Sequence, residues 1–114
     1  MNTKIYHNPR CSKSRQTLSL LEENGVQPEI VEYLKTPPSS EELSNIISML
    51  NIKPQDLLRK KEDIFKELDL DLDDDKKVID AMVKHPKLIE RPIVVHGDKA
   101  KIGRPPEGVL ALFE

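Results

Sequence analysis

Hydrophobic positions near the start of the chain switch between two spacings. Residues 4–6 and 27–34 alternate apolar and polar side chains, which predicts strands, whereas residues 12–24 place leucines at helical spacing. Gly25 follows this helix at the position where a left-handed residue commonly ends one. A strand, a helix and a second strand in this order predict a β-α-β unit with parallel strands.

The middle of the chain, residues 37–85, contains several segments with helical spacing of apolar residues. Pro37 and Pro38 separate this part from the preceding strand, and Ser39 or Ser40 then supplies an N-cap for the next helix. Further helices are expected after Pro54, around residues 64–68 and over residues 75–84. This segment therefore reads as a run of helices without strands.

The C-terminal part returns to short strands. Residues 92–96 and 99–102 flank a Gly-Asp turn and predict a hairpin, and residues 106–113 predict a last helix. The order indicates an α/β protein with a thioredoxin-like fold, in which a helical insertion separates the N-terminal β-α-β unit from the C-terminal β-β-α unit. We expect a single domain over residues 1–114, with its core at about 1–36 and 86–114 and the insertion at about 37–85.

Composition narrows the class of protein. Of 114 residues, 37% are hydrophobic and 33% are charged, which is typical of a soluble globular chain. Eighteen basic residues against 20 acidic ones, with no Trp, two Tyr and two Phe, argue against a nucleic-acid partner. No apolar run is long enough to cross a membrane, and the first residues lack a signal-peptide core, so we expect a cytoplasmic protein without a membrane partner.

Charge is distributed unevenly along the chain. Residues 1–20 contain four basic residues and no acid, and residues 84–104 contain six basic residues and two acids. Residues 62–75, in contrast, contain eight acids and a single lysine. If the two basic ends fold together, they form an anion site; the alternative is scattered, solvated charge.

Cys11 is the only cysteine, and it lies where the first strand passes into the first helix. Helix N-termini favour a thiolate, and Arg10, Lys13 and Arg15 add positive charge, so we expect a lowered thiol pKa. Ser14 can donate a hydrogen bond to the sulfur. Redox chemistry at this cysteine requires a second thiol from another molecule. The alternative is a buried, inert cysteine.

His7 lies four residues before Cys11 and can polarise the thiol. The alternative is that His7 only forms hydrogen bonds within the turn.

Several other classes of protein are disfavoured. A phosphatase loop requires arginine at position 17, which is Thr17, and a dithiol motif requires cysteine at position 14, which is serine. The acidic run at residues 69–75 lacks the glycine of a calcium loop, and three scattered histidines match no zinc spacing, so no metal is expected.

Four segments resemble the ArsC family of glutaredoxin-coupled arsenate reductases, and specifically its short, YfgD-type branch. They span the chain in the family's order: Tyr6-His7-Asn8-Pro9-Arg10-Cys11-Ser12-Lys13-Ser14-Arg15, Leu57-Leu58-Arg59-Lys60-Lys61, Glu90-Arg91-Pro92-Ile93-Val94-Val95 and Ile102-Gly103-Arg104-Pro105-Pro106-Glu107. The resemblance implies a thioredoxin-like core with an inserted helical part.

The resemblance also implies roles for individual residues. It makes Cys11 the nucleophile and assigns stabilisation of its thiolate to His7 and Ser14. It makes Arg59, Arg91 and Arg104 the arginines that hold the oxyanion, and Pro92 the cis-proline of the fold. From charge and order we expect the three arginines to converge on Cys11, because an anionic substrate must meet an anionic sulfur.

The implied enzyme reduces arsenate, or a similar oxyanion, with glutathione as co-substrate and glutaredoxin as partner; it binds no cofactor and acts as a monomer. Two alternatives remain. Spx-like regulators, which bind RNA polymerase, share an Arg-Pro-Ile segment like the one at Arg91, but they commonly carry the second cysteine that Ser14 replaces. A general glutathione-dependent thiol oxidoreductase would use the same cysteine on mixed disulfides.

Overall fold

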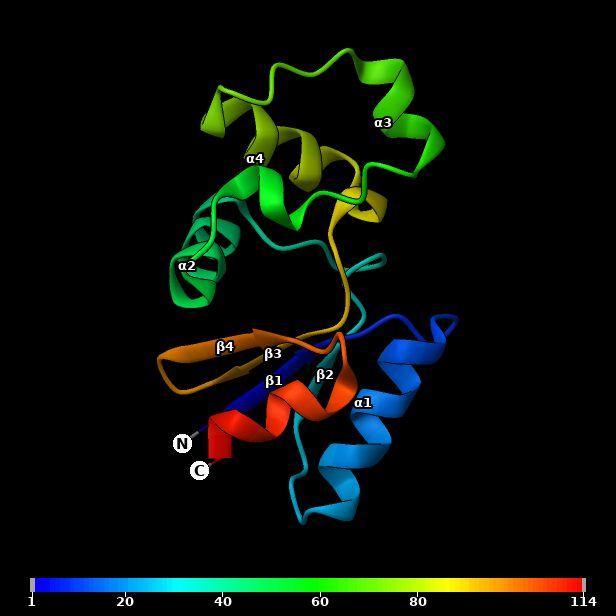
Figure 1. Ribbon diagram of the computed structural model, residues 1–114, viewed down its shortest axis with the longest axis vertical. Helices are drawn as coiled ribbons and strands as arrows, with labels where there is room; N and C mark the ends of the chain where they lie inside the picture. Colours follow the sequence, from blue (N-terminus) through cyan, green and yellow to red (C-terminus); the bar gives the residue numbers. More distant parts are fainter. Residues whose placement is uncertain (1, 114) are drawn as a thin grey trace. The chain divides into compact units, whose positions relative to one another are not determined.

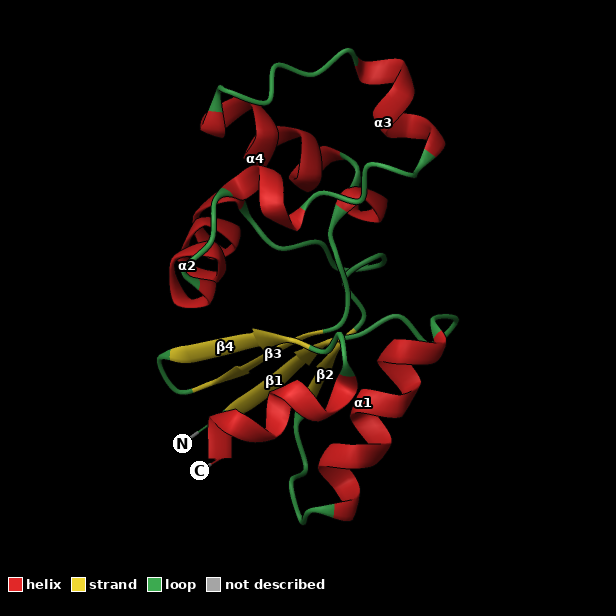
Figure 2. Cartoon of the chain, viewed as in Figure 1, coloured by secondary structure: helices red, strands yellow, loops and turns green. Residues whose placement is uncertain are grey.

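The computed structural model describes residues 2–113, which form two compact units (Figure 1). The first unit combines the chain up to Thr36 with the chain from Arg91 onward, and the second is Pro37–Glu90. Residues 86–90, expected in the core, thus group with the helical insertion. Figure 2 shows that all the strands belong to the first unit.

The first unit is built on a four-stranded mixed sheet. Its strands are β1 (Thr3–Tyr6), β2 (Glu29–Val31), β3 (Ile93–His96) and β4 (Lys99–Ile102), in the order β2-β1-β3-β4. β1 pairs parallel to β2 and antiparallel to β3, and β3 pairs antiparallel to β4. The predicted β-α-β unit and hairpin are both present, and the hairpin turn uses Gly97 at φ 62°.

The register brings four chain segments to one edge of this sheet. Tyr6, the last residue of β1, pairs with Val31 at the end of β2 and with Ile93 at the start of β3. Ile93 in turn pairs with Ile102 at the end of β4. The segments that follow β1, β2 and β4, and the one that precedes β3, therefore all lie at this edge, which we call the β1 C-terminal edge.

Two helical segments cover one face of the sheet, α1 (Ser12–Glu23) and the 3₁₀ helix η3 (Pro106–Phe113), which Figure 1 shows side by side. The apolar side chains between sheet and helices form the core of the unit: Ile5, Leu21, Val94, Val109 and Leu112, with Leu18, Val26 and Phe113 against it. Burial of this one face explains why α1 and η3 carry apolar residues on one side.

Three details differ from the sequence-based expectation. β2 is only three residues long, because the chain turns at Glu32, whose carbonyl accepts hydrogen bonds from the amides of Lys35 and Thr36. The last helix is of the 3₁₀ type, and Pro105 and Pro106 at its start supply no amide donors. Gly25, as expected, adopts a left-handed conformation after α1, with φ 77°.

The second unit is helical, as predicted. It contains α2 (Ser40–Leu50), η1 (Pro54–Leu57), α3 (Asp63–Leu68), α4 (Asp75–Lys84) and η2 (Pro86–Leu88). The Ser39 hydroxyl caps α2 by accepting a 3.1 Å hydrogen bond from the Glu42 amide. α2, α4, η1 and η2 pack through a shared set of buried side chains: Leu43, Ile46, Ile47, Leu57, Val78, Met82 and Leu88.

In contrast, α3 has no buried residue, and it lies in the acidic stretch. A short antiparallel bridge between Leu58 and Ile89 closes the second unit near its C-terminal boundary. None of the helices within residues 2–113 has the length and apolar character needed to span a bilayer.

Candidate active site

Cys11 is held by a short loop at the β1 C-terminal edge. The loop begins where the His7 amide donates to the Val31 carbonyl at 2.8 Å, extending the β1–β2 pairing by one bond. The Asn8 carbonyl then accepts from the Cys11 amide at 3.0 Å, and the Asn8 side chain accepts from the Arg10 amide at 3.0 Å. Cys11 is therefore the N-cap residue of α1, in extended conformation, with its thiol partly exposed.

The surroundings of the sulfur favour the thiolate. Partial burial acts to raise the pKa of the Cys11 thiol, but the backbone amide of Ser14, the side chain of Arg91, the amide of Lys13 and the charge of Arg104 act together in the opposite direction. The net effect lowers the pKa below its ordinary value. The structure therefore places Cys11 where a nucleophilic thiolate forms more readily than in an unfolded chain.

Two of the three expected arginines lie at this sulfur. Arg104 Nη2 lies 3.6 Å from Cys11 Sγ, and its Nε donates a 2.7 Å hydrogen bond to the Arg91 carbonyl. The Arg91 side chain also hydrogen-bonds to the sulfur. Burial alone lowers the pKa of Arg91, yet Tyr33 and Cys11 beside it raise that pKa above the ordinary arginine value. Two guanidinium groups and one thiolate thus share the β1 C-terminal edge.

Arg59, the third expected arginine, belongs to the helical unit. Its Nη1 donates to Glu90 Oε1 at 2.9 Å, and its Nε lies 3.5 Å from Glu62 Oε1. The Arg59 amide donates to the Leu88 carbonyl at 2.7 Å, which fixes the backbone beside the Leu58–Ile89 bridge. Two carboxylates within the unit therefore share the charge of Arg59.

His7 and Ser14 are joined to each other. The Ser14 hydroxyl lies 2.6 Å from His7 Nδ1 and accepts a 3.0 Å hydrogen bond from the Asn8 amide. Burial lowers the pKa of His7, Glu32 opposes this and Arg15 adds to it, so His7 is neutral at pH 7. The sequence suggested that the Ser14 hydroxyl donates to the sulfur; in the structure it ties His7 to the loop, and Ser14 acts on Cys11 through its backbone amide.

Close packing between α1 and the segment before Arg104 sets the position of that arginine. The Arg91–Pro92 and Arg104–Pro105 peptide bonds are both cis. Gly103 donates its amide to the Pro92 carbonyl at 2.9 Å. A Cβ atom on Gly103 would lie 2.5 Å from Thr17 Oγ1 and 2.7 Å from Pro92 Cγ, so this position accepts only glycine without displacement.

Sequence analysis missed Tyr33. It follows β2, it is 1% exposed, and its hydroxyl interacts with the Arg91 guanidinium. A signal was available in the sequence, because the residues that follow a strand parallel to β1 lie at the same sheet edge as Cys11. The alternation of residues 27–34 instead placed Tyr33 inside a longer strand.

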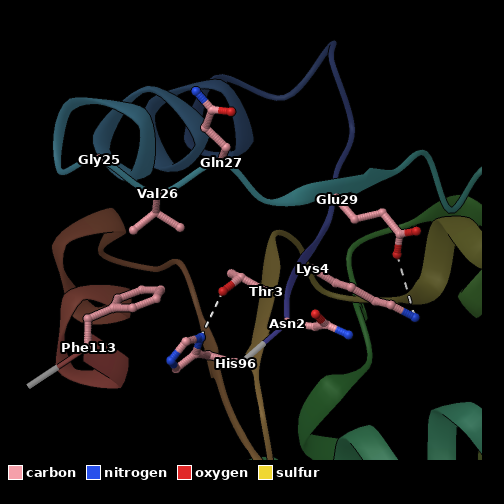
Figure 3. Close-up of a pocket in the computed structure, with 9 residues that line it drawn as sticks. All are labelled: Asn2, Thr3, Lys4, Gly25, Val26, Gln27, Glu29, His96 and Phe113. Atoms are coloured by element: carbon pink, nitrogen blue, oxygen red, sulfur yellow. Dashed lines mark hydrogen bonds and ion pairs between the residues drawn. The ribbon is translucent and has the colours of Figure 1, made fainter.

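A cavity of about 770 Å³ lies at the other end of the sheet (Figure 3). It is lined by residues at the start of β1, after α1 and at the end of β3, including Thr3, Val26 and His96. His96 Nδ1 is 2.7 Å from Thr3 Oγ1, and its ring packs on Phe113 with centroids 4.5 Å apart. The residues that line this cavity include no cysteine and no arginine, so it is distinct from the site at Cys11.

Residues 2–113 contain no group of three or more His, Cys, Asp or Glu side chains arranged to hold a metal ion. The donors at the β1 C-terminal edge are instead amides and guanidinium groups around a sulfur. These groups attract anions, and the chemistry that they support is nucleophilic attack by sulfur on an anionic centre.

Comparison with known proteins identifies the family. The model of the ArsC family matches residues 6–112, so the chain belongs to the ArsC family. Its sequence is 54% identical to YfgD of Escherichia coli K12 over 112 residues, covering 96% of this chain and 94% of that protein. It is 50% identical to the arsenate reductase of Haemophilus influenzae over 116 residues, covering 99% and 100% of the two chains.

The fold agrees with this assignment. The structure of the arsenate reductase from Vibrio cholerae superimposes with a TM-score of 0.91 at 49% identity, covering 97% of each chain. The chain therefore has the thioredoxin-like fold expected from its order of elements. The resemblance noted from four short segments extends over nearly the whole chain.

Proposed function

We propose that this protein is an arsenate reductase that uses the Cys11 thiolate as nucleophile, glutathione as electron donor and glutaredoxin to regenerate the thiol. The observation that carries the proposal is the arrangement of Arg91 and Arg104 around the Cys11 sulfur. Relatives named arsenate reductase, about 50% identical over almost the whole chain, support the same substrate.

The geometry suits a tetrahedral oxyanion. A thiolate and an anionic substrate repel each other unless cations surround both, and guanidinium groups hold oxyanions through paired N–H donors while keeping their charge. Arg104 has its Nε committed to the Arg91 carbonyl, which aims its outer nitrogens toward the sulfur. An oxyanion beside Cys11 would accept hydrogen bonds from these nitrogens and from amides at the start of α1.

Attack on arsenic is the first proposed step. The Cys11 sulfur forms a bond to arsenic(V), and one arsenate oxygen leaves as water after taking up protons. The oxidation state of arsenic does not change in this step. Arg91 and Arg104 stabilise the negative charge that accumulates on the remaining oxygens.

Reduction follows with glutathione. A sulfur–sulfur bond forms between glutathione and Cys11 while the sulfur–arsenic bond breaks, and its electron pair remains on arsenic. Two thiol sulfurs each lose one electron, and arsenic(V) becomes arsenic(III), which leaves as arsenite. The product on the protein is a mixed disulfide between Cys11 and glutathione.

Regeneration requires an external thiol, because Cys11 is the only cysteine of the chain. A glutaredoxin thiolate attacks the glutathione sulfur of the mixed disulfide and releases the Cys11 thiolate. The lowered pKa of Cys11 makes it a good leaving group in this exchange.

The proposal is tested by following NADPH oxidation with arsenate, glutathione, glutaredoxin and glutathione reductase. We expect consumption that depends on both arsenate and this protein and that is lost with Cys11→Ser. A parallel assay with a glutathionylated peptide in place of arsenate tests the general thiol oxidoreductase alternative. Activity on the peptide, with none on arsenate, would replace the proposed substrate.

A further inference from the structure

Tyr33 lies in the same cluster of loops as the reactive sulfur. The segments carrying Cys11, Tyr33, Arg91 and Arg104 follow β1, follow β2, precede β3 and follow β4, and the strand register brings all four to the β1 C-terminal edge. Tyr33 is thus near Cys11 because of the sheet topology, although the two residues lie in different loops.

The Tyr33 side chain is firmly held. Its exposed fraction is 1%, and its hydroxyl oxygen is shielded from solvent. The preceding residue, Glu32, anchors a tight turn through hydrogen bonds of 2.9 and 3.0 Å from the amides of Lys35 and Thr36 to its carbonyl. Removing the partner of a buried polar group is costly in free energy.

The Tyr33 hydroxyl interacts with the Arg91 guanidinium. The Arg91 side chain interacts with Tyr33 on one side and with Cys11 on the other, and its Nε is shielded from solvent. A guanidinium group has five N–H donors in a planar fork, so it can hold a phenol oxygen and a thiolate at once. We propose that Tyr33 is a positioning residue that holds the Arg91 guanidinium against the Cys11 sulfur.

This inference rests on the proposed function insofar as Cys11 is the nucleophile, but it does not depend on the substrate. Without the phenol oxygen, the guanidinium loses one of its two anchors and its average contact with the sulfur weakens. The thiolate then loses part of its stabilisation, and the thiol becomes harder to ionise. Arg104 keeps its own anchor on the Arg91 backbone, so part of the effect on Cys11 persists.

The test is the Tyr33→Phe variant, which keeps the aromatic ring and removes only the hydroxyl. The rate of Cys11 alkylation by iodoacetamide is measured against pH. We expect the inflection to move to higher pH by about 0.5 unit, the equivalent of one ordinary hydrogen bond. Thr3→Val is the control, because it removes a hydroxyl that is hydrogen-bonded to His96 at the other end of the same sheet; its inflection should stay with the wild type.

The same substitution in the Arg91→Met variant separates an effect of Tyr33 on Arg91 from an effect on packing. In Arg91→Met, where the guanidinium is absent, adding Tyr33→Phe should cause no further shift of the inflection. Thermal unfolding by circular dichroism verifies that each variant is folded. An inflection unchanged in Tyr33→Phe, or a shift of the same size in the Arg91→Met background, would overturn the proposal.

Arsenate turnover of the wild-type protein is measured alongside. A Tyr33→Phe shift that requires Arg91, in a protein that does not reduce arsenate, would support the positioning role and reject the proposed substrate. Arsenate turnover with no effect of Tyr33→Phe on the inflection would reject the positioning role alone. The two failures are therefore distinguishable.

Discussion

Arg104 Nη2 lies 3.6 Å from Cys11 Sγ, although 93 positions separate these residues in the chain. The contact exists because β4 ends at the sheet edge where β1 ends, and because Arg104 is anchored by a 2.7 Å hydrogen bond to the Arg91 carbonyl. Arg104 thereby meets both the sulfur and any anion that approaches it.

Replacement of Arg104 tests this role. We expect Arg104→Gln to weaken binding of sulfate or arsenate about 10-fold, since a charge-assisted hydrogen bond contributes roughly 1.5–3 kcal/mol and the group is partly screened by water. Lys101→Gln removes an exposed positive charge from β4 and serves as the matched control. Isothermal titration calorimetry measures the anion affinity of both variants. Equal losses of affinity would show that the effect comes from the net charge of the protein and not from the position of Arg104.

The lowered pKa of Cys11 has a direct signature. Alkylation by iodoacetamide should have its inflection at lower pH in the native protein than in protein unfolded in guanidinium chloride, because the amides of Ser14 and Lys13 and the arginines act only in the folded state. Arg104→Gln should shift the native inflection upward. Coinciding inflections in the native and unfolded protein would contradict the electrostatic account.

His7 predicts a pH dependence of stability. Its pKa is lower in the folded protein, so the unfolded chain binds the proton more readily in the window just below the ordinary histidine value of about 6.5. The stability associated with neutral His7 is complete above that value and is lost as the pH falls through the folded pKa. Urea unfolding between pH 5 and 7.5 gives the free energy of unfolding of the wild type and of His7→Gln. We expect the difference between these two free energies to shrink as the pH falls. A difference that stays constant would contradict this role of His7.

Gly103 offers a test of the packing that positions Arg104. Gly103→Ala should destabilise the fold by about 1–3 kcal/mol, because the added methyl would overlap Thr17 and Pro92. It should also weaken anion binding, since the neighbouring Arg104 must move. Gly108→Ala is the control, because no atom lies within 4 Å of its added Cβ. Urea unfolding should separate the two variants, and equal stability would show that the close approach is not tight.

Much of the fold was predictable because local patterns agreed with the tertiary structure. The leucines of α1, the cap at Ser39 and the turn at Gly97 each specify an element without distant information. β2 was predicted too long because Tyr33 alternates as in a strand, yet it lies within a turn fixed by hydrogen bonds to the Glu32 carbonyl. Side-chain alternation does not reveal where backbone pairing ends.

The site was predictable in part. The position of Cys11 before α1 and its basic neighbours predicted a reactive thiol. The resemblance pointed to Arg59, Arg91 and Arg104, of which Arg91 and Arg104 interact with the sulfur. The bond between the Ser14 hydroxyl and His7 depends on the exact path of the loop, which spacing does not provide. The interaction of Tyr33 with Arg91 depends on strand order, so it emerges only when the sheet is assembled.

Single-turnover mass spectrometry tests the central claim most directly. The protein is mixed with arsenate and glutathione in the absence of glutaredoxin, and intact mass and released arsenite are measured together. We predict that each chain gains one glutathione, on Cys11, as one arsenite is formed, and that Cys11→Ser shows neither. Arsenite formed without the adduct, or an adduct that forms equally without arsenate, would contradict the account.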